Sequence, residues 1–279
     1  AQGLIFGKWC PVSSDFEAAN FPVGFEGGNS GVCPSQNLAE AFDMATGEPF
    51  DWNDESMRSR MFIASARDPR FARTLIYNGA TFKGQPVQSY VGGRNGRPLD
   101  GATPTSYYLR KHIVEATSFV TGSEMSYQHI FPFFRYAEVL LNYAEALAAA
   151  TQNPDFTGMK GEVEYTLSPR EALNAVRARY NMPGITETDY AAFVKRLRNE
   201  RRVELAFEGH RFWDIRRWKI GAETTKVYGL TITPQNDGSF SYMRSVIQQR
   251  GWEDRMNFYP IADAELFKNH NLVQNDGWK

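Results

Sequence analysis

The apolar positions in the second half of the chain follow a helical spacing. Across residues 132–150 they recur every three or four positions, which predicts a helix with one apolar face. A second helix is expected over residues 169–180, because Ser168 can cap its start and a proline occupies its first position. A third is expected over residues 189–208, where Gly209 can end it.

The first half of the chain lacks such a pattern. Residues 1–35 are rich in proline and glycine, which break helices and central strands, so an irregular segment is expected there. Residues 79–106 are a second loop-rich stretch. Short elements are expected between and after these loops: helices over 35–44, 55–64 and 260–268, strands over 71–77 and 107–112, and mixed loop and strand over 221–250.

Together these elements predict a mostly α fold in one domain over residues 1–279. Its helices are of the helical-hairpin, tetratricopeptide-like kind, with long irregular loops and a few short strands between them. We expect a loop-rich, ligand-facing part over residues 1–130, a helical part over 131–220, and C-terminal loops with a short helix over 221–279. Too few hairpins are visible for a complete solenoid, so they are expected to end an array that lies upstream.

Charge and composition narrow the classes of protein. The chain has 31 basic and 32 acidic residues, a balance that argues against a nucleic-acid partner. No apolar run approaches the roughly 20 residues that span a bilayer, and no signal-peptide pattern is visible. Cys10 and Cys33 lack metal-ligand spacing, and the sequence leaves open whether they form a disulfide or stay as two unpaired thiols.

Three regularly spaced glutamates lie in a segment rich in charged residues. Glu200, Glu204 and Glu208 recur every four residues and would lie along one helical face. One hypothesis makes Glu200 and Glu204 the acid and nucleophile of a glycosidase. The favoured hypothesis is ion pairing, which lowers the pKa of a glutamate and so disfavours a general acid. The expected partners are nearby arginines: Arg196, Arg198, Arg201, Arg202 and Arg211.

Two tryptophans and a histidine follow the glutamates. Trp213 and Trp218 are expected to stack on arginine side chains as packing contacts. His210 has no acid or nucleophile at a motif spacing, so a structural hydrogen bond is expected for it.

Six stretches of the chain, taken together and in order, resemble the SusD/RagB family of nutrient-binding surface lipoproteins of Bacteroidetes. The stretches are 33–52 (CPSQNLAEAFDMATGEPFDW), 67–84 (RDPRFARTLIYNGATFKG), 131–150 (FPFFRYAEVLLNYAEALAAA), 173–185 (LNAVRARYNMPGI), 197–219 (LRNERRVELAFEGHRFWDIRRWK) and 258–278 (FYPIADAELFKNHNLVQNDGW). They match only the C-terminal half of the family.

The resemblance implies a mostly helical, non-catalytic binding protein without a cofactor. It implies a lid on a SusC-like TonB-dependent transporter that captures oligosaccharides, with peptides as the alternative ligand. It also implies a location at the extracellular face of the outer membrane, through an N-terminal lipid anchor missing from this chain. Two other classes stay open on the residues: a glycoside hydrolase that uses Glu200 and Glu204, and a structural helical-repeat adaptor.

Aromatic residues in the loops are the candidate ligand contacts. Aromatic rings stack on the C–H faces of sugars, while amide, carboxylate and guanidinium groups bond the hydroxyls. The first candidate group comprises Trp9, Phe16, Phe21 and Phe25 with Asn20 among them, and the second contains Tyr90 and Arg94, with Asn95, Tyr107 and Tyr108 nearby. The alternative is that some of these rings cover the core beneath a long loop.

Overall fold

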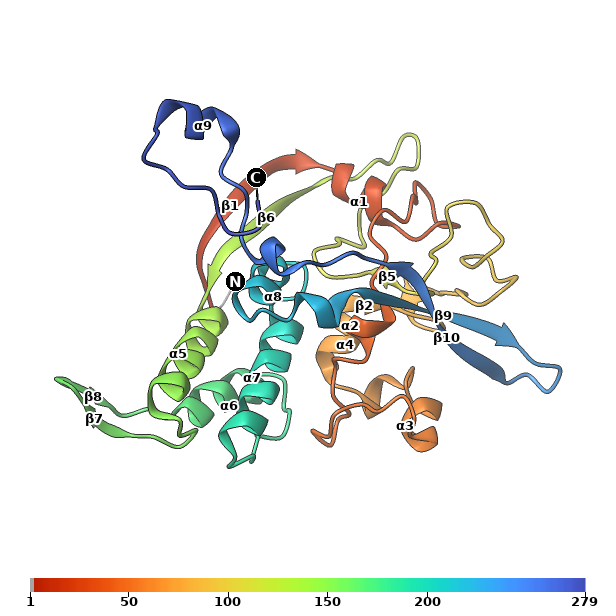
Figure 1. Cartoon of the computed structure of the whole chain (residues 1–279). Helices are drawn as coiled ribbons and strands as arrows, with labels where there is room; N and C mark the ends of the chain where they lie inside the picture. Colours follow the sequence, from red (N-terminus) through yellow and green to blue (C-terminus); the bar gives the residue numbers. More distant parts are fainter. Residues whose placement is uncertain (1–2, 279) are drawn as a thin grey trace.

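Three packed helices form one end of the molecule (Figure 1). In the computed structural model, which describes residues 3–278, they are α5 (Tyr136–Thr151), α6 (Pro169–Ala178) and α7 (Tyr190–Glu204). Small and branched apolar residues fill the space between them: Ala137, Leu141, Ala144, Ala148, Ala172, Leu173, Val176, Phe193 and Leu197. The small side chains among them let the helices approach closely.

The starts of these helices confirm the capping signals. Ser168 accepts a hydrogen bond from the Glu171 amide, and the Glu171 side chain accepts one from the Ser168 amide, which forms a capping box. Asp189 caps α7 by accepting from the Ala192 amide at 2.8 Å. Each cap satisfies backbone donors that the first helical turn leaves unpaired.

A second, aromatic core lies under the loops of the first half. Short elements surround it: α1 (Asp15–Asn20), α2 (Gln36–Ala39), α3 (Glu55–Ser59), α4 (Pro69–Thr74), the strand pair β2 (Leu75–Ile76) and β5 (Tyr108–Leu109), and the pair β3 (Thr81–Phe82) and β4 (Gln85–Pro86). Phe42, Phe71 and Tyr107 are buried in this core, and the Phe42 and Phe71 rings meet edge to face at 5.7 Å.

A long two-stranded antiparallel ribbon arches from α5 over the loops toward α1 (Figure 1). It pairs β1 (Leu4–Ser13) with β6 (Tyr127–Arg135), so that Lys8 lies opposite Phe131. The predicted irregular structure of residues 1–35 is therefore wrong at β1, and the helix predicted from residue 132 begins only at Tyr136. Both strands expose side chains on both sides, so neither shows the alternation that reveals a strand.

Two hairpins project to opposite sides of the molecule (Figure 1). The longer one pairs β9 (Lys226–Pro234) with β10 (Phe240–Gln249), within the segment predicted as mixed loop and strand. The shorter one pairs β7 (Gly158–Lys160) with β8 (Val163–Tyr165). The remaining elements are the short turns Ala64–Ala66, Gly221–Thr224 and Asp254–Asn257 and the helices α8 (His210–Arg217) and α9 (Asp263–Lys268).

Several further boundaries differ from the prediction. Helices α2 and α3 end at Ala39 and Ser59, before the predicted residues 44 and 64, and α9 begins at Asp263 rather than at residue 260. Residues 71–74, predicted as strand, belong to helix α4, which Asp68 caps through the Arg70 amide. Helix α7 ends at Glu204 rather than Glu208, because Phe207 and Gly209 adopt left-handed backbone with φ of 62° and 85°. Glu208 therefore lies in the turn between α7 and α8.

Helices account for 32% of the chain and strands for 20%, and the remainder is irregular. The helical-hairpin, tetratricopeptide-like character of the helices stays a prediction. Cys10 and Cys33 are both unpaired thiols, which agrees with one of the two alternatives from the sequence. Within residues 3–278, no helix combines the length and apolar character needed to cross a bilayer.

Candidate functional site

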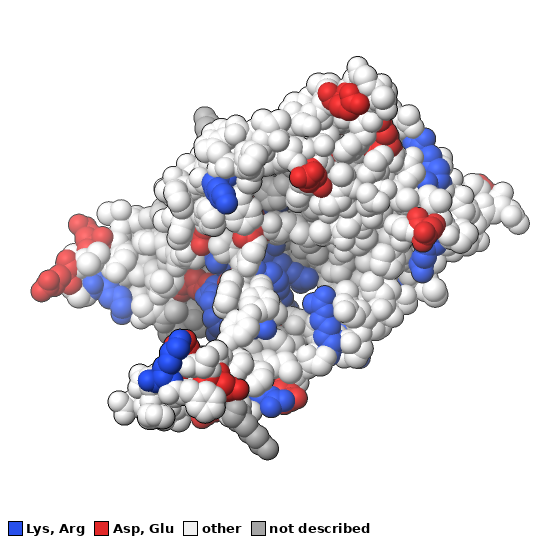
Figure 2. Space-filling view, turned by 90° about the horizontal axis from the view of Figure 1, so that it is seen from above, with Lys and Arg blue, Asp and Glu red and all other residues white. Residues whose placement is uncertain are grey.

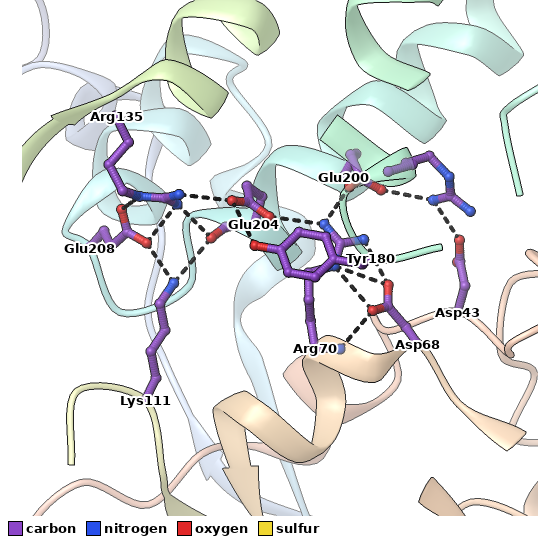
Figure 3. Close-up of polar contacts among 10 residues, drawn as sticks. Asp43, Asp68, Arg70, Lys111, Arg135, Tyr180, Glu200, Glu204 and Glu208 are labelled. Carbon is purple, nitrogen blue, oxygen red and sulfur yellow. Dashed lines mark hydrogen bonds and ion pairs between the residues drawn. The ribbon is translucent and has the colours of Figure 1, made fainter. Parts of the chain in front are cut away.

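The three glutamates bind cations from distant parts of the chain (Figure 3). Glu200 on α7 accepts hydrogen bonds from Arg70 at 2.5 Å and from Arg177 at 2.8 Å. Glu204 is bound by Arg70 at 3.1 Å and by Arg135 at 2.9 Å. All three glutamates are buried, so these pairs are shielded from water.

Glu208 continues the network past the end of α7. Arg135 donates to it at 2.7 Å and Lys111 at 2.5 Å. Burial alone would raise the pKa of the Glu208 carboxyl, but the hydrogen bonds from Arg135 and the charge of Lys111 outweigh it, so the pKa lies below its usual value. A carboxyl with a lowered pKa is ionised at neutral pH and does not serve as a general acid.

We call this array of Glu200, Glu204, Glu208 and their basic partners the charge ladder. It confirms ion pairing, but the predicted partners on the same helix are wrong. Arg196 binds Asp43, and Arg201 binds Asp214. The actual partners come from α4, the loop after β5, the end of β6 and α6, so the ladder joins the helical end to the aromatic core.

Trp213 on α8 and Trp218, the C-cap residue of that helix, differ in their contacts. Trp218 lies between the guanidinium groups of Arg198 and Arg217, at 4.9 and 4.6 Å from the ring centre, as predicted. Trp213 is exposed and contacts Phe212 and Tyr259 instead, so the arginine stack predicted for it is wrong. His210 Nδ1 lies 3.5 Å from Arg201 Nη2, at the long end of hydrogen-bond distance, which agrees with the structural hydrogen bond predicted for it.

The predicted aromatic contacts separate into exposed and buried side chains. Trp9 lies on β1 with 64% of its surface exposed. Phe16 on α1 is half-buried, and its ring centre lies 5.6 Å from that of His129. Phe21 is fully buried against Phe82, so its ring does not reach the surface.

The other predicted residues lie on or below the loops. Asn20 is buried, donates to the Phe16 carbonyl and accepts from the Val32 amide, and therefore fixes the loop. Phe25 is half-buried beneath the Arg94 guanidinium, whose carbon lies 5.4 Å from the ring centre. Tyr90 is half-buried and stacks on Phe240 at 5.2 Å. Asn95, Tyr107 and Tyr108 are buried.

A cleft of about 590 Å³ opens beside Phe16. Its lining is mostly apolar and includes His129 and Phe131 from β6, and His112 and Phe207 from the loops. Both His112 and Phe207 hold left-handed backbone, with φ of 69° and 62°. Such conformations are costly for bulky residues and cluster at functional sites.

His112 brings an unsatisfied group to this cleft. Within residues 3–278 its buried Nε2 atom has no hydrogen-bond partner. Burial, followed by the charge of Lys111, lowers the pKa of the imidazole, so His112 is neutral at pH 7. Neither His112 nor His129 was predicted as a site residue, because an isolated histidine carries no motif signal. In the described part of the chain, no three His, Cys, Asp or Glu side chains are placed to hold a metal ion.

Comparisons with known proteins identify relatives of the whole chain. A sequence model of the SusD family matches residues 13–278. SusD-like protein P2 of Formosa agariphila is 33% identical over 146 residues, which cover 51% of this chain and 24% of that protein. A SusD-like protein of Bacteroides fragilis has a similar structure, with a TM-score of 0.77 at 27% identity, and the match covers 99% of this chain and 55% of that one.

A second solved structure from Bacteroides fragilis, described as a SusD-like carbohydrate-binding protein, gives a TM-score of 0.73 at 29% identity. The match covers 98% of this chain and 54% of that one. The chain therefore spans about half the length of these solved relatives.

Proposed function

The chain belongs to the SusD family, and from this premise we propose that it is a non-catalytic surface protein that captures oligosaccharides. In this proposal it delivers them to a SusC-like TonB-dependent transporter at the extracellular face of the outer membrane, held there by an N-terminal lipid anchor. The observation that supports glycan capture best is the exposed aromatic surface at Trp9 together with the adjoining cleft at Phe16.

The aromatic surface has the chemistry that sugars require. The Trp9 indole is open to solvent, and the cleft beside Phe16 places aromatic rings next to histidine nitrogens. A pyranose ring stacked on Phe16 or Phe131 would bring its hydroxyls near His112, whose Nε2 atom is unsatisfied. Phe25, Arg94 and Tyr90 form the second proposed contact region.

The charge ladder supports a function without catalysis. Glu200 and Glu204 each bind two cationic side chains and are buried, so neither presents a free carboxyl to a bound glycan. The hydrolase hypothesis needs one protonated and one free carboxyl facing a common substrate. The ladder offers neither arrangement.

Calorimetric titration with a panel of neutral and acidic oligosaccharides and short peptides tests the proposal. We expect binding to at least one glycan, and Trp9→Ala to weaken it without a change in melting temperature. Phe267→Ala is the matched control, because Phe267 is an exposed aromatic residue on α9 that does not line the cleft. Binding to peptides alone would replace glycan capture with peptide capture. Release of reducing ends that Glu204→Gln abolishes would establish the hydrolase instead.

A further inference from the structure

A second and larger cleft contains two arginines that form no ion pair with any residue of the described range 3–278. It has a volume of about 720 Å³ and lies where α8, α2 and the ends of β9 and β10 meet. Its charged lining consists of four basic side chains and one acid: Arg202, Arg211, Lys226, Arg250 and Glu223. The whole chain has a net charge of -1, so this basic excess is local. Figure 2 shows a hollow on one face of the molecule in which Lys and Arg side chains lie beside Asp and Glu side chains.

Arg202 and Arg211 differ from the other half-buried and buried arginines nearby. Arg201, the residue before Arg202, binds Asp214 at 2.8 Å, and Arg217 binds the same carboxylate at 2.8 Å. Within the described residues, 3–278, Arg202 and Arg211 form neither an ion pair nor a hydrogen bond. Both are half-buried, so water screens them less than it screens an exposed arginine.

Two of the three acids whose charges act on these two arginines are bound elsewhere, and the third, Glu223, acts on Arg211 from the lining of the same cleft. Glu40, whose charge acts on Arg202, binds Arg244 at 2.7 Å. Asp214, whose charge acts on Arg211, is shared by Arg201 and Arg217. Burial, and then the like charge of Arg211, lowers the pKa of Arg202 to about 10. The two arginines therefore carry positive charge that the single acid of the cleft, Glu223, offsets only in part, and a bound anion would stabilise them further.

The rest of the lining has the character of a glycan site. Phe207 and Phe212 offer aromatic surface, and Gln248 and Thr224 offer amide and hydroxyl groups. The volume falls within the range of small-ligand pockets. Guanidinium groups bind carboxylate and sulfate oxygens through paired, charge-assisted hydrogen bonds.

We propose that this cleft binds the acidic group, a carboxylate or a sulfate ester, of an anionic glycan through Arg202 and Arg211. The proposal rests on the glycan-capture function above and specifies the class of glycan. Phe207 and Gly209 line both clefts, so the two clefts are adjacent. Neutral sugar units of the same glycan would therefore contact the aromatic surface at Phe16 and Trp9.

Calorimetry with oligomers of matched length tests the proposal: an oligogalacturonate, a sulfated galactan oligomer and a neutral galactan oligomer. We expect one of the two acidic oligomers to bind more tightly than the neutral one, and more weakly as salt is raised. Arg211→Gln and Arg202→Gln should each weaken that binding roughly 10- to 100-fold, the loss expected for a charge-assisted bond to a carboxylate or sulfate. The acidic oligomer that binds identifies whether the group is a uronate or a sulfate ester.

Arg60→Gln is the charge-matched control, because Arg60 is exposed on the surface beside α3 and bonds only to Ser56. It should leave every affinity unchanged. Melting temperatures verify that each variant is folded, and Arg250→Gln at the same cleft replaces Arg202→Gln if the latter unfolds.

Four results would overturn the proposal. Equal binding of acidic and neutral oligomers, unaffected by Arg211→Gln, would leave glycan capture intact but remove the anion site. Sodium sulfate that competes as well as the oligomer does would show an adventitious ion only. Oligoglutamate that binds where no acidic glycan does would assign the cleft to an acidic polypeptide. Failure of every glycan to bind would overturn the proposed function together with this inference.

Discussion

Arg70 is the side chain whose loss should damage the charge ladder most. It bonds Asp68 at 2.7 Å, Glu200 at 2.5 Å and Glu204 at 3.1 Å, and each of these side chains is at most 5% exposed. Replacement by methionine keeps most of the volume and removes the charge. Glu200 keeps Arg177 and Glu204 keeps Arg135, but Asp68 loses the guanidinium that bonds both of its oxygens. Removing one member of a buried ion pair lowers the free energy of unfolding by about 3–5 kcal/mol.

Urea unfolding followed by circular dichroism measures this cost. We expect Arg70→Met to lower the free energy of unfolding by about 3–5 kcal/mol. Arg170→Met is the control, because Arg170 binds Asp155, whose side chain is 55% exposed, and loss of such a pair costs at most about 1 kcal/mol.

A second replacement distinguishes the energetic cost of an unpaired buried carboxylate from the cost of lost side-chain packing. In the Arg70→Met background, Glu200→Gln removes one of the carboxylates left without full compensation. The two changes together should cost less than the sum of each alone, by roughly 1 kcal/mol or more. Strict additivity, or a loss in Arg70→Met no larger than in Arg170→Met, would refute the view that the ladder holds the two cores together.

Three further predictions follow from single contacts. Because Arg135 and Lys111 hold the pKa of Glu208 below its ordinary value of 4.5, the stability gap between the native chain and Glu208→Gln should be full above pH 4.5. It should close as the pH falls through the folded pKa, and a gap that persists at pH 2 would contradict the assignment. Ser168→Ala should cost about 1 kcal/mol of unfolding free energy through loss of the α6 capping box, whereas Ser59→Ala, outside any cap, should cost less. Phe21→Ala should cost about 3–5 kcal/mol because the ring is fully buried, whereas Trp9→Ala should leave the melting temperature unchanged.

Features encoded by neighbouring residues were predictable from the sequence. Ser168 and Asp189 cap α6 and α7 because the signal lies within three residues of each helix start. The ribbon was not predictable, because β1 pairs with a strand more than a hundred residues later and contains one glycine and one proline. The pair Asp68 and Pro69 is an ambiguous local signal, because an Asp-Pro pair can follow the end of one helix or begin another, and here it begins α4.

The candidate site was predicted only in part for a related reason. A loop without periodicity does not reveal which of its side chains point inward, so Trp9 and Phe21 were indistinguishable in the sequence. In the structure one is exposed on a strand and the other lies at the centre of the aromatic core. Arg202 and Arg211 were predicted to neutralise the glutamate row, and only the fold shows that more distant cations had taken those positions.

The charge ladder also has a consequence for the order in which the chain folds. Arg70, Lys111 and Arg135 precede their glutamates by 69 to 134 residues. During synthesis these cations leave the ribosome well before the acids that neutralise them, and the loops that join them are slow to close. The two cores therefore dock late, once the chain is complete to residue 208. A nascent chain that stalls before that point exposes both its unpaired arginines and the apolar faces that α7 covers.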